Sequence, residues 1–279
     1  MKAKDATPNA GSRAKRLPLI FGVSGHRDLV VADVPRLHKH LSKIFAAFRA
    51  AYPHTPFQLL SPLAEGADRL TAEVALTSEI GLLVPLPMKQ QEYERDFQTA
   101  KSLAEFRALL AMAESRWEMP MVANPHTENR TRQYAEVGDF IARHSHVLIL
   151  LWDGSDNKKI GGTAWVRKRR EHWVNAASSP FHGIVPLGYG PTIRVVTPRA
   201  SGRPPRPRPA TIGKLPPSAE EFAVTLSKQL SSQRGRNKHK CLPLYQLVYW
   251  AIDRFNANVP ASAPMESRKE RQSATRSRL

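Results

Sequence analysis

The chain has 279 residues, and its 41% hydrophobic content is enough for one large domain or two small ones. Its single cysteine, Cys241, excludes an internal disulfide, and no run of about 18 apolar residues suits a membrane-spanning helix. Residues 1–16 are polar and basic, without the apolar core of a signal peptide. These features predict a cytoplasmic protein with no membrane span.

The net charge of +18 lies mostly at the two ends of the chain. Residues 1–16 carry five Lys and Arg against one acidic residue, and residues 199–279 carry sixteen against five. The stretch between them is nearly neutral. A basic tail of this kind can neutralise the phosphates of nucleic acid, but a solvated, disordered extension explains the same charge. Both interpretations stay open.

Apolar runs alternate with helical periodicities between residues 17 and 198. The pattern predicts strands at residues 17–23, 57–61, 81–86, 147–152, 183–187 and 193–197. It predicts helices at residues 33–52, 69–78, 91–113, 130–143 and 161–174. Such alternation is typical of an α/β protein with a doubly wound, mainly parallel sheet covered by helices on both faces.

The composition divides the chain into five parts. We expect a disordered basic N-terminus (1–16), the α/β domain (17–198), an Arg/Pro linker (199–217), a short helical region (218–258) and a disordered basic tail (259–279). The helical region begins with a capping box at Ser218 and contains an amphipathic helix at residues 244–255. The apolar face of that helix predicts a core or dimer contact.

Ligands of open parallel sheets bind beyond the carboxyl ends of the strands, so the loops that follow strands are the candidate sites. The first such loop contains Gly22, Ser24, Gly25, His26 and Arg27. Its glycines let backbone N–H groups approach an anion, and Arg27 supplies a positive charge. An ordinary tight turn with a surface arginine is the alternative.

The second loop contains Glu65, Gly66, Asp68 and Arg69, between a strand and a helix. Asp68 can cap the helix or accept hydrogen bonds from a ribose. Glu65 can bind a ribose or act as an acid or base.

The third candidate combines Asp153 and Gly154, after the most apolar strand, with Gly161, Gly162 and Thr163 at the start of a helix. Unpaired N–H groups and the helix dipole both favour an anion at such a start. The sequence therefore predicts a phosphate site here, with a simple glycine-rich turn as the alternative.

Four segments, in order, resemble the SLOG superfamily, which joins DprA-like DNA-processing proteins and LOG-like enzymes. They are FGVSGHRDL, SPLAEGADRL, QYAEVGDFIARHSHVLILLWDG and GGTAW, and the resemblance covers residues 17–198. It implies a Rossmann-like fold that binds a nucleotide or nucleotide-derived ligand, with phosphate on the glycine-threonine turn and on the first loop. LOG-like relatives also suggest a homodimer.

The chain departs from the LOG-like active-site pattern P-G-G-x-G-T-x-x-E. Ile160 replaces the proline, the intermediate glycine is missing, and Val166 stands where the glutamate belongs. Hydrolysis of an N-glycosidic bond requires a carboxylate. Glu65 and Asp153 are the candidates to supply it.

Three functions follow as hypotheses. The first is a ligand-binding sensor domain of a bacterial defence or signalling system, acting with a separate effector protein. The second is a nucleotide N-glycosidase that acts on nucleoside monophosphates, and the third is DprA-like binding of single-stranded DNA through the basic tail. We expect no cofactor, and no metal because the histidine pairs His38/His40 and His144/His146 lack companion ligands.

Overall fold

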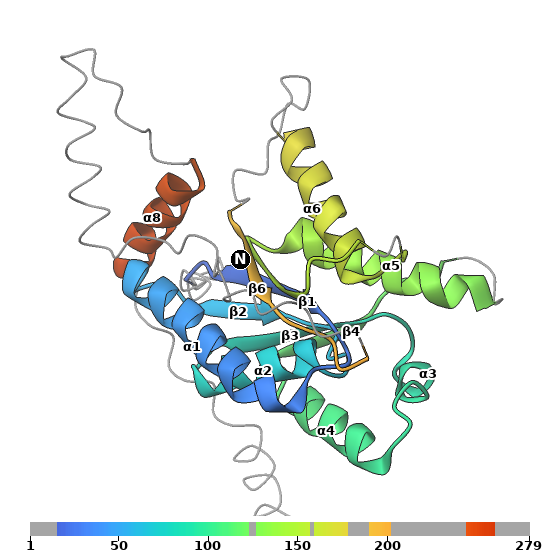
Figure 1. Cartoon of the computed structure of the whole chain (residues 1–279). Helices are drawn as coiled ribbons and strands as arrows, with labels where there is room; N and C mark the ends of the chain where they lie inside the picture. The colour runs from blue at the N-terminus through green and yellow to red at the C-terminus, as the bar shows by residue number, and fades with distance from the viewer. Residues whose placement is uncertain (1–15, 123–126, 157–158, 178–189, 202–243, 260–279) are drawn as a thin grey trace, which may run out of the picture.

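The computed structural model describes residues 16–122, 127–156, 159–177, 190–201 and 244–259. Its centre is a six-stranded sheet in the order β4-β3-β2-β1-β5-β6, and all its strand pairs are parallel (Figure 1). The strands are β1 (Leu19–Gly25), β2 (Phe57–Leu60), β3 (Gly81–Leu86), β4 (Ser115–Glu118), β5 (Val147–Trp152) and β6 (Thr192–Val196). The predicted α/β fold with a parallel sheet is confirmed.

The strand order reverses at β1. The chain proceeds outward from β1 through β2 and β3 to β4, and then returns to place β5 on the other side of β1. Phe21 and Gly22 of β1 each pair with both neighbours, with β2 through Leu59 and Leu60 and with β5 through Val147 and Leu148. In an open parallel sheet such a reversal leaves a crevice between two diverging loops, here those after β1 and β5.

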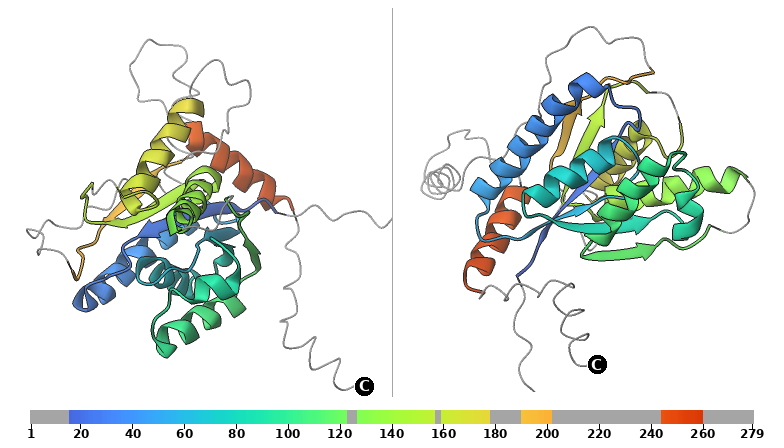
Figure 2. Two further views of the ribbon diagram at one scale, coloured as in Figure 1. Left: turned by 90° about the vertical axis from the view of Figure 1, so that its right-hand side faces the viewer. Right: turned by 90° about the horizontal axis from the view of Figure 1, so that it is seen from below.

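Helices cover both faces of the sheet (Figures 1 and 2). One core cluster joins the sheet to α1 (Val34–Ala51), α2 (Ala67–Thr77) and α4 (Ala100–Ala111), and the other joins it to α5 (Thr127–His144) and α6 (Thr163–Ala177). The shorter elements are the 3-10 turn η1 (Val31–Asp33) and α3 (Gln90–Glu94). The result is the three-layer arrangement that parallel sheets require to bury both faces.

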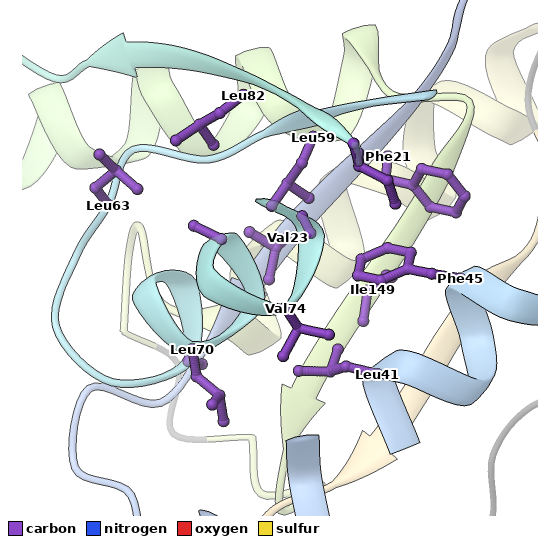
Figure 3. Close-up of a cluster of buried hydrophobic side chains, with 14 of the residues drawn as sticks. Phe21, Val23, Leu41, Phe45, Leu59, Leu63, Leu70, Val74, Leu82 and Ile149 are labelled. Atoms are coloured by element: carbon purple, nitrogen blue, oxygen red, sulfur yellow. The ribbon is translucent and has the colours of Figure 1, made fainter. Parts of the chain in front are cut away.

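The larger core cluster packs around Phe21 of β1 (Figure 3). Its ring meets Phe45, Phe48 and Phe57 edge-on, with centroids 5.0–5.5 Å apart. Edge-to-face contacts of this kind add to the free energy gained from burial alone. The β1 strand is therefore fixed against α1 before it reaches the crevice.

Helix α8 (Leu244–Ala257) packs at the end of the sheet where the strands begin, their amino ends. Asp253 accepts hydrogen bonds from the His54 N–H and the Thr55 hydroxyl, just before β2, and Asn256 pairs with the backbone of Leu17, before β1. Tyr249 is fully buried. The helix packs on the core, but mainly through Gln246, Tyr249, Asp253 and Asn256, whereas Phe255 of the predicted apolar face is 47% exposed. This contact lies at the end of the sheet opposite the crevice.

Two elements differ from the sequence prediction. The edge strand β4 was not predicted, because Ser-Arg-Trp-Glu is largely exposed and has no apolar run. The predicted helix at 91–113 is two helices, since Thr99 caps α4 by accepting the Ser102 N–H at 3.1 Å. The predicted strand at 183–187 and the residues 202–243 and 260–279 lie outside the described residues. None of the described helices is long and apolar enough to cross a membrane.

Candidate functional site

A cavity of about 430 Å³ opens at the carboxyl edge of the sheet, where the strand order reverses. Its walls come from the end of β1, the loop after β2, α3, α5 and the loop that leads into α6. Small-molecule sites typically have volumes of about 300 to 1,000 Å³. Doubly wound sheets bind their ligands at this position.

The cavity brings together most of the residues that the sequence singled out. Eight of them line it: Ser24, Gly25, His26, Arg27, Asp68, Gly161, Gly162 and Thr163. The other six lie outside its lining: Gly22, Glu65, Gly66, Arg69, Asp153 and Gly154. The first and third predicted loops and one residue of the second therefore meet at a single place.

Several of the glycines allow loops to approach one another. A Cβ atom on Gly25 would lie 2.3 Å from the Cβ of Ala67, and one on Gly66 would lie 2.3 Å from the carbonyl oxygen of Arg27. Gly66 also has a φ of 78°, which L side chains rarely adopt. These glycines thus hold the loop after β1 against the start of α2, which shapes the cavity.

Gly154 and Gly22 have similar packing roles. A Cβ atom on Gly154 would lie 2.2 Å from the guanidinium of Arg194, and one on Gly22 would lie 2.7 Å from Ser145. Gly161 has a φ of 75° and faces the backbone of α5 at Ala135. Close packing accounts for Gly22, and positive φ angles account for Gly154 (96°) and Gly161 (75°), without a ligand.

His26 joins the two loops of the crevice. Its Nε2 accepts the backbone N–H of Asp153 at 3.0 Å, so the ring proton sits on Nδ1. That Nδ1 is buried without a hydrogen-bond partner among the described residues. Burial, followed by the charge of Arg199, lowers the pKa of His26, which favours the neutral ring. A neutral imidazole with an unused donor therefore stands beside the cavity.

Asp153 holds its own loop in place. Its carboxylate accepts hydrogen bonds from the N–H and hydroxyl of Ser155 at 2.8 and 2.7 Å. Burial raises the pKa of Asp153, but the two hydrogen bonds from Ser155, followed by the charge of Arg199, outweigh burial and leave the pKa below the ordinary value. The carboxylate is thus ionised and already engaged.

Asp68 is the buried carboxyl group of the cavity. Burial raises its pKa to about 7, although Arg27 and a hydrogen bond from the Ala64 N–H act in the opposite direction. It does not cap α2, because Gly66 occupies the N-cap position without a side-chain hydrogen bond. Asp68 can therefore gain or lose a proton near neutral pH inside the cavity.

Glu65 and Arg69 connect α2 to α4. Glu65 accepts the hydroxyl proton of Ser102, and Arg69 donates to the carbonyl and hydroxyl oxygens of Ser102 at 2.9 Å. Arg69 also lies over the ring of Phe97, 4.4 Å from its centroid. The two residues thus hold the start of α2 and the loop before it against α4.

Sequence reasoning missed a cluster that surrounds Asp96. The carboxylate of Asp96 accepts hydrogen bonds from Arg130 and from the hydroxyl of Tyr134, both on α5. The guanidinium of Arg27 lies 5.2 Å from the ring centre of Tyr134 and 4.0 Å from Asp96. The spacing of Arg130, Tyr134, Val137 and Ile141 on one face of a predicted helix was the available signal.

The buried ring of Tyr93, on α3, and the segment after β6 complete the cavity. Tyr93 was not predicted, since it lay inside an apparently continuous helix. Arg199 was assigned to the linker and its basic tail, but its side chain lines the cavity together with Asp28. Both residues belong to connections whose path the sequence pattern does not reveal.

Cationic side chains outnumber carboxylates in the lining of the cavity, although Asp96 and Asp153 lie just outside the lining within 4.0 Å of three of the cations. Four cationic side chains line it, against two carboxylates, those of Asp28 and Asp68. The cations are Arg27, Arg130, Lys159 and Arg199. In α6 the Val166 N–H donates to the Gly162 carbonyl, so the three N–H groups before Val166 lack helical acceptors, while the Gly162 N–H donates to the Lys159 carbonyl at 3.1 Å. Charge and helix dipole both favour an anion here.

The described ranges contain no group of three or more His, Cys, Asp or Glu side chains that could hold a metal ion. The lining offers arginine and lysine side chains, backbone amides, an imidazole and the carboxyl groups of Asp28 and Asp68.

No protein-family model matches the sequence, and no curated protein matches it. The solved structures that match include two DNA processing proteins. The X-ray structure of DNA processing protein A from Streptococcus pneumoniae is 13% identical with a TM-score of 0.38, over 56% of this chain and 47% of that chain. DNA processing protein A from Helicobacter pylori, whose structure concerns its single-stranded DNA binding mode, is 15% identical with a TM-score of 0.35, over 55% and 62%.

Proposed function

We propose that the protein binds a nucleotide or nucleotide-derived ligand in the cavity between the loops after β1 and β5. The observation that carries the proposal is that cationic side chains outnumber carboxylates in the lining of a cavity at the point where the strand order reverses. Phosphate would lie on Arg27 and the start of α6. The aromatic walls, Tyr93 and Tyr134, suit a nucleoside.

The anion part of the proposal is tested with Arg27→Ala and inorganic phosphate at constant ionic strength. Loss of a charge-assisted contact weakens binding by roughly ten-fold or more. Arg116→Ala is the matched control, because Arg116 is an exposed arginine of β4 outside the cavity lining. Equal affinity in the two variants would show that phosphate does not bind at Arg27.

A second candidate is hydrolysis of a nucleoside monophosphate at its N-glycosidic bond. It rests on Asp68, which lines the cavity as a buried carboxyl group, whereas Glu65 and Asp153 lie outside the lining and are engaged elsewhere. Asp68 would protonate or stabilise the reacting group. Release of free base that is lost in Asp68→Asn would support this activity, and no release over hours by the wild type would exclude it.

The remaining expectations stay predictions. Binding of single-stranded DNA depends on basic residues in 202–243, outside the described residues. A sensor role in bacterial defence, an effector partner, a homodimer and a cytoplasmic location rest on the sequence alone.

A further inference from the structure

The segment after β6 returns to the loop after β1. The Thr197 N–H donates to the carbonyl of Trp152 at 3.2 Å, and Arg199 forms an isolated antiparallel bridge with Leu29. Next along the chain, the Ala200 N–H donates to the backbone carbonyl of Asp28 at 2.9 Å. This segment therefore lies across the ends of β1 and β5, at the edge of the cavity.

The side chain of Asp28 fastens the same segment. Its carboxylate accepts the hydroxyl proton of Ser201, and the Ser201 N–H lies 3.4 Å from it. Burial raises the pKa of Asp28, but the hydrogen bonds from Ser201 outweigh burial and lower the pKa below the ordinary value. We call the Asp28–Ser201 pair the clasp.

The clasp places Arg199 between two carboxylates without short contacts to either. Its Nη1 lies 3.9 Å from Asp28 and its Nε lies 3.8 Å from Asp153. Neither distance is short enough for a hydrogen bond. The side chain is 34% exposed and lines the cavity. Its position contrasts with that of Arg130, which makes short hydrogen bonds to Asp96 and the Glu92 carbonyl.

We propose that Arg199 is an anion-binding residue of the cavity and that the clasp positions it there. The inference rests on the proposed function and adds a residue from the start of the C-terminal extension to the binding site. The ligand chemistry is a phosphate group, which the guanidinium recognises with paired N–H donors. Asp28 and Ser201 act through Arg199 rather than by touching the ligand.

The direction in which Asp28→Ala changes the affinity for phosphate distinguishes positioning of Arg199 from simple electrostatics. Asp28→Ala removes a negative charge from the cavity wall, so charge alone predicts tighter binding of inorganic phosphate. The clasp predicts weaker binding, because Arg199 loses its fixed position. Asp33→Ala is the matched control, since it removes a carboxylate from η1 that pairs with Arg36 instead.

Inorganic phosphate is titrated at constant ionic strength into the wild type and the variants. We expect Arg199→Ala to weaken binding roughly ten-fold and Ser201→Ala roughly three-fold. Arg199→Lys, which keeps the charge but not the paired donors, should fall between the wild type and Arg199→Ala. Ser42→Ala, on the exposed side of α1, and Arg116→Ala should leave the affinity unchanged.

A double-mutant cycle of Arg199 and Ser201 distinguishes a clasp that acts on binding through Arg199 from one that only stabilises the fold. If the clasp acts through Arg199, then Ser201→Ala has no further effect once Arg199 is alanine. Additive losses, or tighter binding by Asp28→Ala, would overturn the inference. Unchanged affinity in Arg199→Ala while Arg27→Ala is weakened would overturn it too, and would leave the proposed function standing. Equal affinity in Arg27→Ala, Arg199→Ala and Arg116→Ala would instead contradict the proposed function.

Discussion

Arginine has opposite roles at the amino and carboxyl ends of the strands, which we call the amino edge and the carboxyl edge of the sheet. At the amino edge, Arg170 is 1% exposed and donates to the carbonyls of Ala142, Ser145 and His146 at 2.7–2.9 Å. At the carboxyl edge, Arg27 and Arg199 line a cavity with ion-pair distances of 3.8–4.0 Å. An arginine surrounded by carbonyls stabilises the fold, whereas one held loosely beside a cavity can bind an anion.

The largest effect should come from breaking the amino edge. Arg170→Ala leaves several buried carbonyls without a donor, so we expect a loss of about 3 to 5 kcal/mol in the free energy of unfolding. Arg27→Ala should cost under about 0.5 kcal/mol, as surface substitutions usually do. Urea unfolding of both variants measures the contrast. Similar losses in the two variants would contradict the division between the edges.

The next effect concerns pH, through His146 at the amino edge. Its Nδ1 accepts the Ile20 N–H at 2.9 Å, and burial, followed by the charge of Arg170, lowers its pKa to about 4. The folded protein therefore disfavours the protonated ring, so stability is full above the unfolded pKa of about 6.5 and falls as pH drops from there towards 4. The loss should reach about 3 kcal/mol once the pH is below 4.

Urea unfolding at pH 7 and pH 5 measures this dependence. His146→Asn should reduce the difference between the two values, and His26, whose pKa is also lowered, should account for part of what remains. His172→Asn, in an exposed position of α6, is the control. If the free energy of unfolding differs between pH 7 and pH 5 by the same amount in the wild type and His146→Asn, another group is responsible.

The smallest effect lies in the cavity. Because the pKa of Asp68 is raised to about 7, the cavity gains a negative charge as pH rises through neutrality. Binding of sulfate, whose own charge is constant in this range, should weaken roughly three-fold between pH 6 and pH 8. Asp68→Asn should abolish this change. A pH dependence that persists in Asp68→Asn would assign it to a different group.

The sequence predicted the elements whose pattern of apolar residues matches the periodicity of a strand or a helix. Buried strands such as β5 show as apolar runs, and helices such as α1 show as amphipathic repeats, so the α/β fold followed directly. The exposed edge strand β4 has no such run. The break before α4 depends on a single capping residue, Thr99, within an otherwise helical pattern.

The site was predictable where it follows a strand in the sequence. Arg27, Asp68 and the turn at Gly162 lie in loops after strands or at helix starts, and they line the cavity. Asp96 and Arg199 lie in segments between other elements, and only the three-dimensional path of the chain brings them to the same place. Asp153 has the right position in the sequence, but its carboxylate is turned to Ser155.

A thermal-shift panel tests nucleotide binding in the cavity most directly. It compares the wild type and Arg27→Ala with ADP-ribose, NAD, nucleoside monophosphates, cyclic nucleotides and inorganic phosphate. Binding to the native state alone raises the apparent Tm. We predict that one nucleotide class raises the Tm of the wild type above the value in inorganic phosphate, and that Arg27→Ala loses this increase. No selective increase with any nucleotide, or an equal increase in Arg27→Ala, would contradict nucleotide binding in the cavity.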